Sequence, residues 1–325
     1  MKKKEKVLVT GAGGFIGHHL VKFLKDKGYW VRGADIKKPE FEKTNSDEFF
    51  LLNLRNKEAT LRATEGIDHV YNLASNMGGV GFIERVHAEI MHDNLLIDTN
   101  VIDAAYRNNV QRYFYSSSAC IYPINKQTGT KNTGLKENDA YPADPDNEYG
   151  WEKIVAERLC INYYKDYGFE TRVARFHNVY GPLGTWQGGR EKSPAALCRK
   201  IALAKDGDKI EVWGDGKQTR SYCFIEDCVE GIYKLIMSDI REPLNIGSDR
   251  LVSINELIDI IAKIADKKVG KKYDTTKPQG VRGRNSNNEL INKYLHWEPS
   301  LPLGKGLSKT YYWIKGQIEQ GKLQK

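Results

Sequence analysis

The fold of this chain is decided by residues 7–17, Val-Leu-Val-Thr-Gly-Ala-Gly-Gly-Phe-Ile-Gly. The apolar start, Val7–Thr10, is typical of a buried strand. The stretch Gly14–Lys27 that follows has apolar residues at helical spacing and meets a stop signal at Gly28. A strand, a glycine turn and a helix in direct succession predict a dinucleotide-binding unit.

The glycines of this turn each have a separate task. Gly11 permits the tight turn, Gly14 lets a pyrophosphate approach the backbone, and Gly17 lets the helix and the strand pack closely. A phosphate in the turn meets exposed N–H groups and the positive end of the helix dipole. The residues expected to form this cradle are Gly11, Gly13, Gly14, Phe15, Ile16 and Gly17.

An acid completes the pattern. Asp35 ends the predicted strand Trp30–Asp35, eighteen residues past Gly17. A carboxylate at this place accepts hydrogen bonds from the adenosine ribose hydroxyls and repels a 2′-phosphate. We therefore predict NAD as the cofactor, with Lys37 and Lys38 close enough to soften the preference against NADP.

The first half of the chain alternates β-rich runs with helical stretches, and after Phe176 this alternation stops. The pattern predicts an α/β fold, namely a Rossmann doubly wound parallel sheet with a smaller C-terminal substrate-binding lobe. The expected NAD-binding domain is 1–176 with 217–242 returning to it, and the lobe is 177–216 and 243–325. Further expected strands are Phe49–Leu52, Val70–Ala74, Tyr113–Ser117 and Arg172–Phe176; expected helices are Ala88–Asn108, Tyr149–Tyr167, Ile254–Ala265 and Leu303–Gln320.

Composition narrows the classes of partner. Five cysteines without C-x-x-C spacing indicate free thiols in a reducing compartment, and the spacing of the seven histidines gives no metal site. The net charge of +8 is dispersed, without the basic and aromatic run of a nucleic-acid site. No apolar run reaches membrane-spanning length, and the apolar stretch after the basic start is too short for a secretion signal. We expect a cytoplasmic protein whose partners are neither nucleic acid nor membrane.

Tyr149 and Lys153 form the pattern Y-x-x-x-K. Residues four apart on a helix share a face, so the ammonium can stabilise the phenolate, whose unperturbed pKa is about 10. Such a tyrosinate can take the proton of an alcohol as its hydride leaves for NAD. The same spacing begins at Tyr122, Tyr273 and Tyr311, which we place in a loop, a turn-rich stretch and a helix of the second lobe. Only Tyr149 begins a long helix within the cofactor domain.

Ser118 and Cys120 follow the strand expected at Tyr113–Ser117, on the edge of the sheet where ligands bind. Ser118 can hydrogen-bond the reacting hydroxyl. Cys120 can act as a base or nucleophile where cationic neighbours lower its pKa from about 8.5. The remaining cysteines are expected to be small buried apolar side chains: Cys160, Cys198, Cys223 and Cys228.

Taken together, these motifs resemble the extended short-chain dehydrogenase/reductase family, whose members modify nucleotide sugars. The resemblance covers nearly the whole chain and is strongest to the branch that epimerises GDP-mannose at C3 and C5. The segments that carry it are Asn76–Ile83, Ser117–Pro123, Tyr149–Lys153, Arg175–Pro182, Gly184–Lys192, Trp213–Gly216 and Gly280–Ser286.

The resemblance implies a mechanism. Tyr149, helped by Lys153 and Ser118, would deprotonate the sugar 4-hydroxyl while hydride moves from C4 to NAD. The resulting ketone acidifies the hydrogens at C3 and C5, which Cys120 as base and Lys192 as acid would exchange. Return of the hydride to C4 then gives GDP-L-galactose, with GDP-L-gulose as the 5-epimer.

The resemblance also implies binding residues. Asn53 and Leu54 would contact NAD, although the family more often has Asp at position 53. Asn76 follows Ser75 where Ala-Asp is usual, which leaves the exact sugar less certain than the reaction type. The GDP-sugar would be held by Gly78, Ser118, Ala119, Cys120, Asn178, Glu191, Lys192 and Ala195 near the sugar, and by Lys200, Gln218, Thr219, Arg220 and Arg282 near the diphosphate.

Other functions remain open at this point. A 4,6-dehydratase has Thr followed by acidic residues where this chain has Cys120-Ile121-Tyr122, and a nucleotide-sugar 4-epimerase needs neither Cys120 nor Lys192. A non-catalytic NAD-binding regulatory protein typically lacks the tyrosine or the lysine that this chain keeps. In the family the helices expected at Ala88–Asn108 and Tyr149–Tyr167 pair across a twofold axis, so a homodimer is expected.

Overall fold

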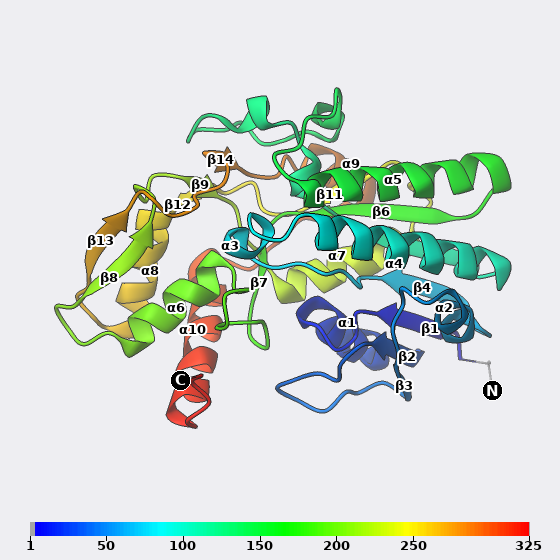
Figure 1. Ribbon diagram of the computed structural model, residues 1–325, viewed down its shortest axis with the longest axis horizontal. Coiled ribbons are helices and arrows are strands. Elements are labelled where there is room, and N and C mark those ends of the chain that lie inside the picture. The colour runs from blue at the N-terminus through cyan, green and yellow to red at the C-terminus, as the bar shows by residue number, and fades with distance from the viewer. Residues whose placement is uncertain (1–3, 325) are drawn as a thin grey trace.

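The computed structural model describes residues 4–324. Outside the described residues lie 1–3, which belong to the basic start and to the expected cofactor domain, and 325, which belongs to the expected lobe. A seven-stranded parallel sheet of order β11-β6-β5-β4-β1-β2-β3 forms the centre (Figure 1). This confirms the predicted fold class. The strands are β1 (Lys6–Thr10), β2 (Trp30–Asp35), β3 (Glu48–Leu51), β4 (His69–Asn72), β5 (Arg112–Ser118), β6 (Thr171–Phe176) and β11 (Leu244–Ile246).

Helices cover both faces of the sheet, because strands buried on two sides need two apolar layers. Along β1 the side chains alternate between the layers: Val7 and Val9 pack in the same apolar cluster as Leu20 and Leu24, whereas Leu8 belongs to the opposite cluster. On one side lie α1 (Phe15–Asp26) and α7 (Ile225–Met237), and on the other lie α2 (Lys57–Thr64), α4 (Ala88–Arg107) and α5 (Glu148–Tyr167).

The strand order places a ligand site between β1 and β4. The chain runs from β1 outward to β2 and β3, and then crosses to β4 on the other side of β1. Ligands of open parallel sheets bind at this switch point, outside the carboxyl ends of the strands. Gly11 lies there with φ +69, and a Cβ on it would come within 2.9 Å of the Ala74 backbone. The turn after β1 therefore packs directly against the segment after β4.

The smaller lobe lies beyond the carboxyl ends of the strands, at the left of Figure 1. Its apolar residues join the same cluster as one face of the sheet, including Leu257, Ile261 and Leu307. The helices of the lobe are α6 (Ser193–Leu203), α8 (Ile254–Ala265) and α10 (Leu303–Glu319). Its strands are β8 (Lys209–Trp213), β9 (Thr219–Arg220), β12 (Val252–Ser253), β13 (Gly270–Asp274) and β14 (Gly283–Arg284). Two further short strands, β7 (Val179–Tyr180) and β10 (Cys223–Phe224), pair with each other. The remaining α-helices are the short α3 (Val80–Ile83) and α9 (Glu289–Leu295).

The predicted elements of the first half are all present, with ends shifted by at most two residues, but much of the second half was not foreseen. Helix α7 lies inside the expected return segment 217–242, whereas β11 lies just beyond it, in a stretch assigned to the lobe. Tyr273 lies in β13 rather than in a turn. These lobe strands have two to five residues and pair with distant segments, so local periodicity carries little trace of them.

The close packing of α1 on the glycine turn gives a stability prediction. A Cβ at Gly17 would overlap the Gly11 carbonyl oxygen, so Gly17→Ala should lower the free energy of unfolding by about 1–3 kcal/mol. The matched change Gly316→Ala, in α10 with no atom within 4 Å of the added methyl, should raise it by about 0.5–1 kcal/mol. Urea denaturation of both variants measures the two shifts, and equal shifts would contradict the packing argument.

Candidate active site

The glycine turn and Asp35 form a cradle suited to a dinucleotide. The Asp35 carboxylate accepts the Gly13 N–H at 2.9 Å and the Lys37 N–H at 3.1 Å, one on each oxygen. Burial raises the pKa of this carboxyl, and the N–H groups of Lys37 and Gly13 oppose the rise. Each oxygen keeps a lone pair for a ribose hydroxyl. Because a Cβ on Gly13 would overlap the Lys37 carbonyl, the loop after β2 closes tightly on the turn.

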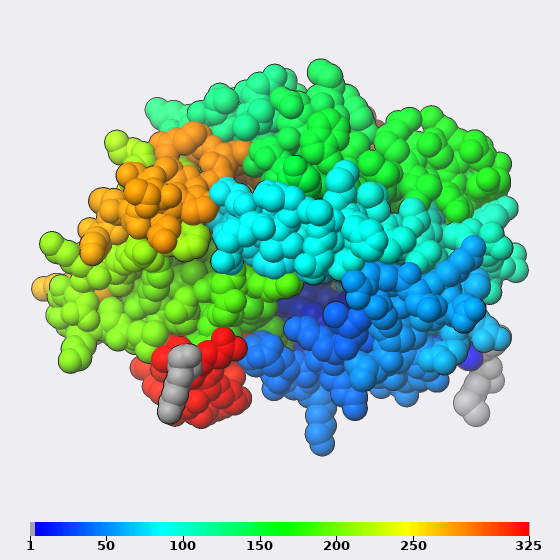
Figure 2. All heavy atoms as spheres, viewed as in Figure 1, coloured from blue at the N-terminus to red at the C-terminus, as the bar shows by residue number. Residues whose placement is uncertain are grey.

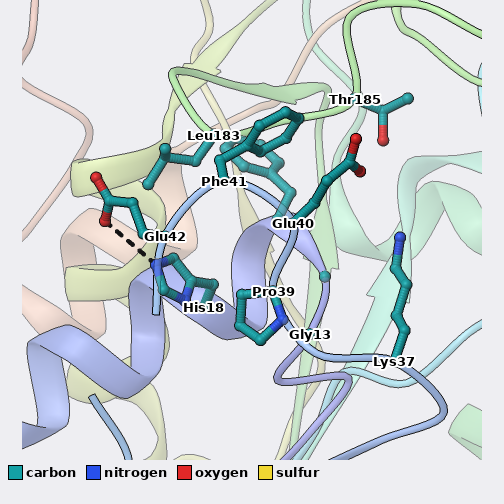
Figure 3. Close-up of a pocket in the computed structure, with 11 residues that line it drawn as sticks. Gly13, His18, Lys37, Pro39, Glu40, Phe41, Glu42, Leu183 and Thr185 are labelled. Carbon is teal, nitrogen blue, oxygen red and sulfur yellow. Dashed lines mark hydrogen bonds and ion pairs between the residues drawn. The ribbon is translucent and has the colours of Figure 1, made fainter. Parts of the chain in front are cut away.

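A small cavity of about 40 Å³ lies at the outer rim of this cradle, between Gly13, the loop Lys37–Glu42 and the pair Leu183 and Thr185 (Figure 3). It is too small for a dinucleotide and has room for a few waters. The C-terminal end of the loop is held by two contacts. Glu42 lies 3.4 Å from His18 of α1, and Phe41 packs edge-on against Trp313 of α10 with ring centroids 5.0 Å apart. The rim thus ties the cofactor cradle to the smaller lobe.

A second cavity, of about 410 Å³, forms a cleft between the carboxyl ends of the strands and the smaller lobe. Its volume is that of a small-molecule site. Figure 2 shows a neighbouring hollow, where the blue and cyan N-terminal segments meet the green middle of the chain; the residues that line the 410 Å³ cleft begin only at Met77. Among the predicted residues, those that line the cleft are Gly78, Ser118, Ala119, Cys120, Tyr149, Asn178, Glu191, Lys192, Lys200, Gln218 and Arg220.

Helix α5 places Tyr149 in this cleft. The Asn147 side chain caps the helix by accepting the Gly150 N–H at 3.0 Å. A Cβ on Gly150 would overlap the Cys120 carbonyl, so glycine lets the first turn of α5 approach the turn after β5. Lys153 lies one turn further, with Nζ 5.4 Å from the Tyr149 ring centroid. The predicted shared face of tyrosine and lysine is therefore present.

Lys153 lies beneath the cleft rather than in its lining, and its side chain is 1% exposed. Burial alone lowers the pKa of its ammonium, but Glu152 at 3.6 Å and Asp98 at 3.8 Å outweigh burial and raise it. For Tyr149 the balance is opposite: burial raises the pKa of the phenol more than Lys153 lowers it. Lys153 does lower the pKa of Tyr149, as expected, but by less than burial raises it.

Both carboxylates beside Lys153 are held by neutral groups. Asp98 accepts hydrogen bonds from Asn72 at 2.9 Å and from the Tyr115 hydroxyl at 2.8 Å. Glu152 accepts one from Asn94 at 2.8 Å, and burial raises the pKa of Glu152 to about 8 against the opposing charge of Lys153. The ammonium is thus paired on two sides in a water-poor region, as a buried charge must be.

Cys120 has a cationic neighbour that the sequence analysis missed. Arg284 Nη1 donates to Cys120 Sγ at 3.2 Å, and a second nitrogen lies 3.4 Å from the Asp146 carboxylate. Ser118 Oγ accepts the Cys120 N–H at 3.1 Å and so orients the turn. The sulfur of Cys120 thus lies in contact with a guanidinium, the kind of cationic setting in which reactive cysteines are found. Arg284 lies within the segment Gly280–Ser286 that carries the family resemblance. The signal that could have identified it is the need of a reactive cysteine for a nearby cation.

Lys192 reaches the cleft from the smaller lobe. It occupies the N-cap position of α6 and lines the same cavity as Cys120 and Tyr149. Burial lowers the pKa of its ammonium, while Cys120 opposes the fall. An ammonium that gives up its proton more readily than a surface lysine can serve as an acid and a base.

The cleft also carries cations suited to a diphosphate. The Arg220 guanidinium donates to the Thr219 and Gln279 carbonyls and pairs with no carboxylate within residues 4–324. Burial, with Arg284 nearby, lowers the pKa of Arg220 to about 10. Lys200 lies on the same wall, 2.8 Å from Glu211. An unpaired guanidinium in a cleft favours an anionic ligand.

Besides Lys153 and the residues of the cofactor cradle, five predicted residues lie outside the cleft lining. Arg282 is turned away, with Nη1 3.0 Å from Asp215, and Thr219 is held by a hydrogen bond to the Thr130 carbonyl. Ala196 lines the cleft in place of Ala195, because successive residues of a helix face different directions. Asn53 is exposed and accepts hydrogen bonds from Arg55, whereas Leu54 packs in the core.

Further expectations concern cysteines, metals and membranes. All five cysteines are free, as predicted, with Cys120 half-buried and the other four buried. Over residues 4–324 there is no group of three or more His, Cys, Asp or Glu side chains arranged to hold a metal ion. The helices of that part of the chain include none with the length and apolarity to cross a membrane.

Comparison with known proteins agrees with this geometry. Residues 7–247 match the NAD dependent epimerase/dehydratase family. The chain is 52% identical to a GDP-mannose 3,5-epimerase of Arabidopsis thaliana, over 98% of this chain and 84% of the relative, and 51% identical to GDP-mannose 3,5-epimerase 1 of Oryza sativa subsp. japonica, over 99% and 85%. It shares its fold with a UDP-glucose 4-epimerase of Thermotoga maritima, at a TM-score of 0.87 and 23% identity, covering 96% of this chain and 99% of the other.

Glu152 gives a pH prediction. The folded chain keeps the Glu152 proton up to a pH of about 8, whereas the unfolded chain loses it near the ordinary value of 4.5. The contribution of Glu152 to the free energy of unfolding therefore falls as the pH rises through that window. Urea denaturation across the window should show Glu152→Gln gaining stability relative to the unaltered chain as the pH rises. Asp166→Asn, an exposed change on the same helix, should show no such trend; parallel curves for both variants would refute the assignment.

Proposed function

The chain belongs to the NAD-dependent epimerase/dehydratase family, and from this premise we infer that it epimerises GDP-mannose at C3 and C5, by way of transient oxidation at C4. The products are GDP-L-galactose and, after inversion at C5 alone, GDP-L-gulose. One observation carries the proposal: Cys120 and Lys192 line the same cleft as Tyr149. The high identity to GDP-mannose 3,5-epimerases supports the same reaction and substrate.

The residues around Tyr149 suit chemistry at C4. NAD in the cradle of Asp35 and the glycine turn supplies a reversible hydride acceptor. Tyr149 takes the proton of the 4-hydroxyl, and its phenolate is stabilised by the Lys153 ammonium beneath it. Ser118, at the edge of the cleft, orients the hydroxyl. Because Glu152 and Asp98 raise the pKa of Lys153, the ammonium stays charged while the tyrosine changes its protonation state.

Chemistry at C3 and C5 falls to Cys120 and Lys192. A ketone at C4 acidifies the hydrogens on both neighbouring carbons, so a thiolate can remove them. We assign Cys120 as the base, with the Arg284 guanidinium in contact with its sulfur, and Lys192 as the acid that returns a proton from the other side. Simple 4-epimerisation would use Tyr149 and Lys153 and leave Cys120 and Lys192 without a task.

Incubation of the purified protein with GDP-mannose and no added NAD tests the proposal. A resident cofactor that is reduced and reoxidised within one turnover should give GDP-L-galactose and GDP-L-gulose. A product changed only at C4 would point to a 4-epimerase, and a 4-keto-6-deoxy sugar would point to a dehydratase. No conversion of any nucleotide sugar, together with bound NAD, would favour a non-catalytic binding protein.

We also propose a homodimer and a cytoplasmic location. Helices α4 and α5 pack side by side and expose Leu96, Trp151 and Val155, apolar side chains that a second copy can cover. Five free cysteines suit a reducing compartment. The division into a cofactor domain and a substrate lobe is likewise a proposal, supported by a cleft lined from both.

Cys120→Ala should abolish solvent deuterium incorporation at C3 and C5 while NAD stays bound, because the base for both carbons is lost. Mass spectrometry of the sugar nucleotide after reaction in deuterated water measures the uptake. Lys205→Ala, at an exposed lysine outside the cleft, is the control and should leave uptake unchanged. Normal uptake in the Cys120 variant would remove this residue from the mechanism.

The placement of the arginines predicts a difference in substrate binding. Arg220→Ala should raise KM by roughly tenfold to a hundredfold, the effect of losing about 1.5–3 kcal/mol of charged hydrogen bonding to the diphosphate. Arg282→Ala should leave KM near its original value, because Asp215 holds that guanidinium outside the cleft. Initial-rate kinetics on both variants measure the two KM values. A larger rise in KM for Arg282→Ala than for Arg220→Ala would contradict the geometry.

A further inference from the structure

Arg190 joins the two walls of the cleft at its mouth. Its carbonyl accepts the Gly79 N–H at 3.0 Å, and its Nη1 donates to Asn76 Oδ1 at 3.1 Å. The guanidinium also lies 3.8 Å from the Phe82 ring centroid, a favourable stack for an arginine. These contacts connect the loop before α6 with the segment that enters α3, which lie more than a hundred residues apart in the sequence. Neither Arg190 nor Asn76 is needed for the steps described above.

The contact determines where Lys192 stands, because the chain between the two residues is rigid. Glu191 accepts the Gly189 N–H on one carboxylate oxygen and Arg199 on the other, both at 2.7 Å. A Cβ on Gly79 would overlap the Glu191 carbonyl, so the two backbones pack with no space between them. Lys192 follows directly and caps α6. Movement of Arg190 away from Asn76 would therefore carry Lys192 with it.

On its inner side, Asn76 is connected to the Tyr149 centre. Its N–H donates to Asn94 Oδ1 at 2.6 Å, and Asn94 Nδ2 donates to Glu152 at 2.8 Å. Glu152 lies 3.6 Å from Lys153. Asn94 and Glu152 are fully buried. One chain of contacts thus runs from Arg190 at the surface to the ammonium beneath the tyrosine, with Asn76 as its junction.

We propose that Arg190 is a positioning residue of the proton exchange at C3 and C5: its contact with Asn76 closes the cleft mouth and fixes Lys192 relative to Cys120. The inference rests on the proposed function. It also gives a role to Asn76, which stands where the family resemblance expects Asp. An amide holds the guanidinium by a hydrogen bond rather than an ion pair, and the contact is exposed, so the mouth can open for product release at modest cost.

The test separates C4 oxidation from proton exchange in the full-length holoenzyme supplied with GDP-mannose. Arg190→Ala should lower the rate of solvent deuterium uptake at C3 and C5 by roughly threefold to fivefold, as expected for losing an exposed contact worth up to about 1 kcal/mol. The burst of reduced nicotinamide that reports C4 oxidation should stay close to that of the unaltered enzyme, which also shows that the variant is folded. Arg190→Lys, which keeps the charge but loses the planar fork, should lie between the two.

Arg62→Ala is the matched control, since Arg62 is an exposed arginine near a phenylalanine ring, 5.5 Å from the Phe50 centroid, on α2. It should change neither signal. Asn76→Ala should lower deuterium uptake, and its effect should not add to that of Arg190→Ala, because both changes remove one contact. Full additivity, or uptake in Arg190→Ala equal to that in the control, would overturn the inference while leaving the proposed function intact. An unaltered enzyme that takes up no deuterium at C3 or C5 would overturn both.

Discussion

A single buried ammonium, that of Lys153, constrains the centre of this molecule. With its side chain 1% exposed, it has lost nearly all its water and needs charges of opposite sign within reach. Asp98 of α4 and Glu152 of α5 place carboxyl oxygens 3.8 Å and 3.6 Å from it and raise its pKa, so the two helices must pack side by side. The carboxylates in turn need donors of their own. Asn72 of β4 and Tyr115 of β5 serve Asp98, and Asn94 serves Glu152, so the pairing reaches from the helices into the sheet.

The same arrangement explains how a tyrosine with a raised pKa can still act as a base. Burial disfavours the phenolate of Tyr149, and the Lys153 charge beneath it reduces that cost. A second positive charge, that of oxidised nicotinamide, acts in the same direction when NAD is bound. Because Glu152 and Asp98 raise the pKa of the Lys153 ammonium against the effect of burial, it does not lose its proton when Tyr149 gains one. The pair therefore suits a reaction in which the same proton leaves the 4-hydroxyl and returns to it.

The proposed proton exchange at C3 and C5 depends on residues from separate elements of the sheet and the lobe, rather than on one helix. Cys120 comes from the turn after β5, Lys192 from the start of α6, and Arg284 from the strand β14 of the smaller lobe. Only the closure of the lobe on the sheet brings these groups into one cleft. The proposed clasp of Arg190 on Asn76 belongs to the same closure, which is why a residue at the surface can govern a proton transfer inside.

Local sequence determined the cofactor half of this protein. The glycine turn, Asp35 and the Y-x-x-x-K helix are set by residues within a few turns of one another, so spacing alone places them, and the structure has the expected strand and helix at each position. The place of Cys120 after a strand singled it out, and the resemblance to a known family added Lys192; both line the cleft. Tertiary structure alone decided the phosphate end. Arg282 and Arg284 are two residues apart in one motif, yet Asp215 draws Arg282 away while Cys120 and Asp146 hold Arg284 in the cleft. No periodicity distinguishes the two arginines, because the partners that separate them lie more than sixty residues away in the sequence.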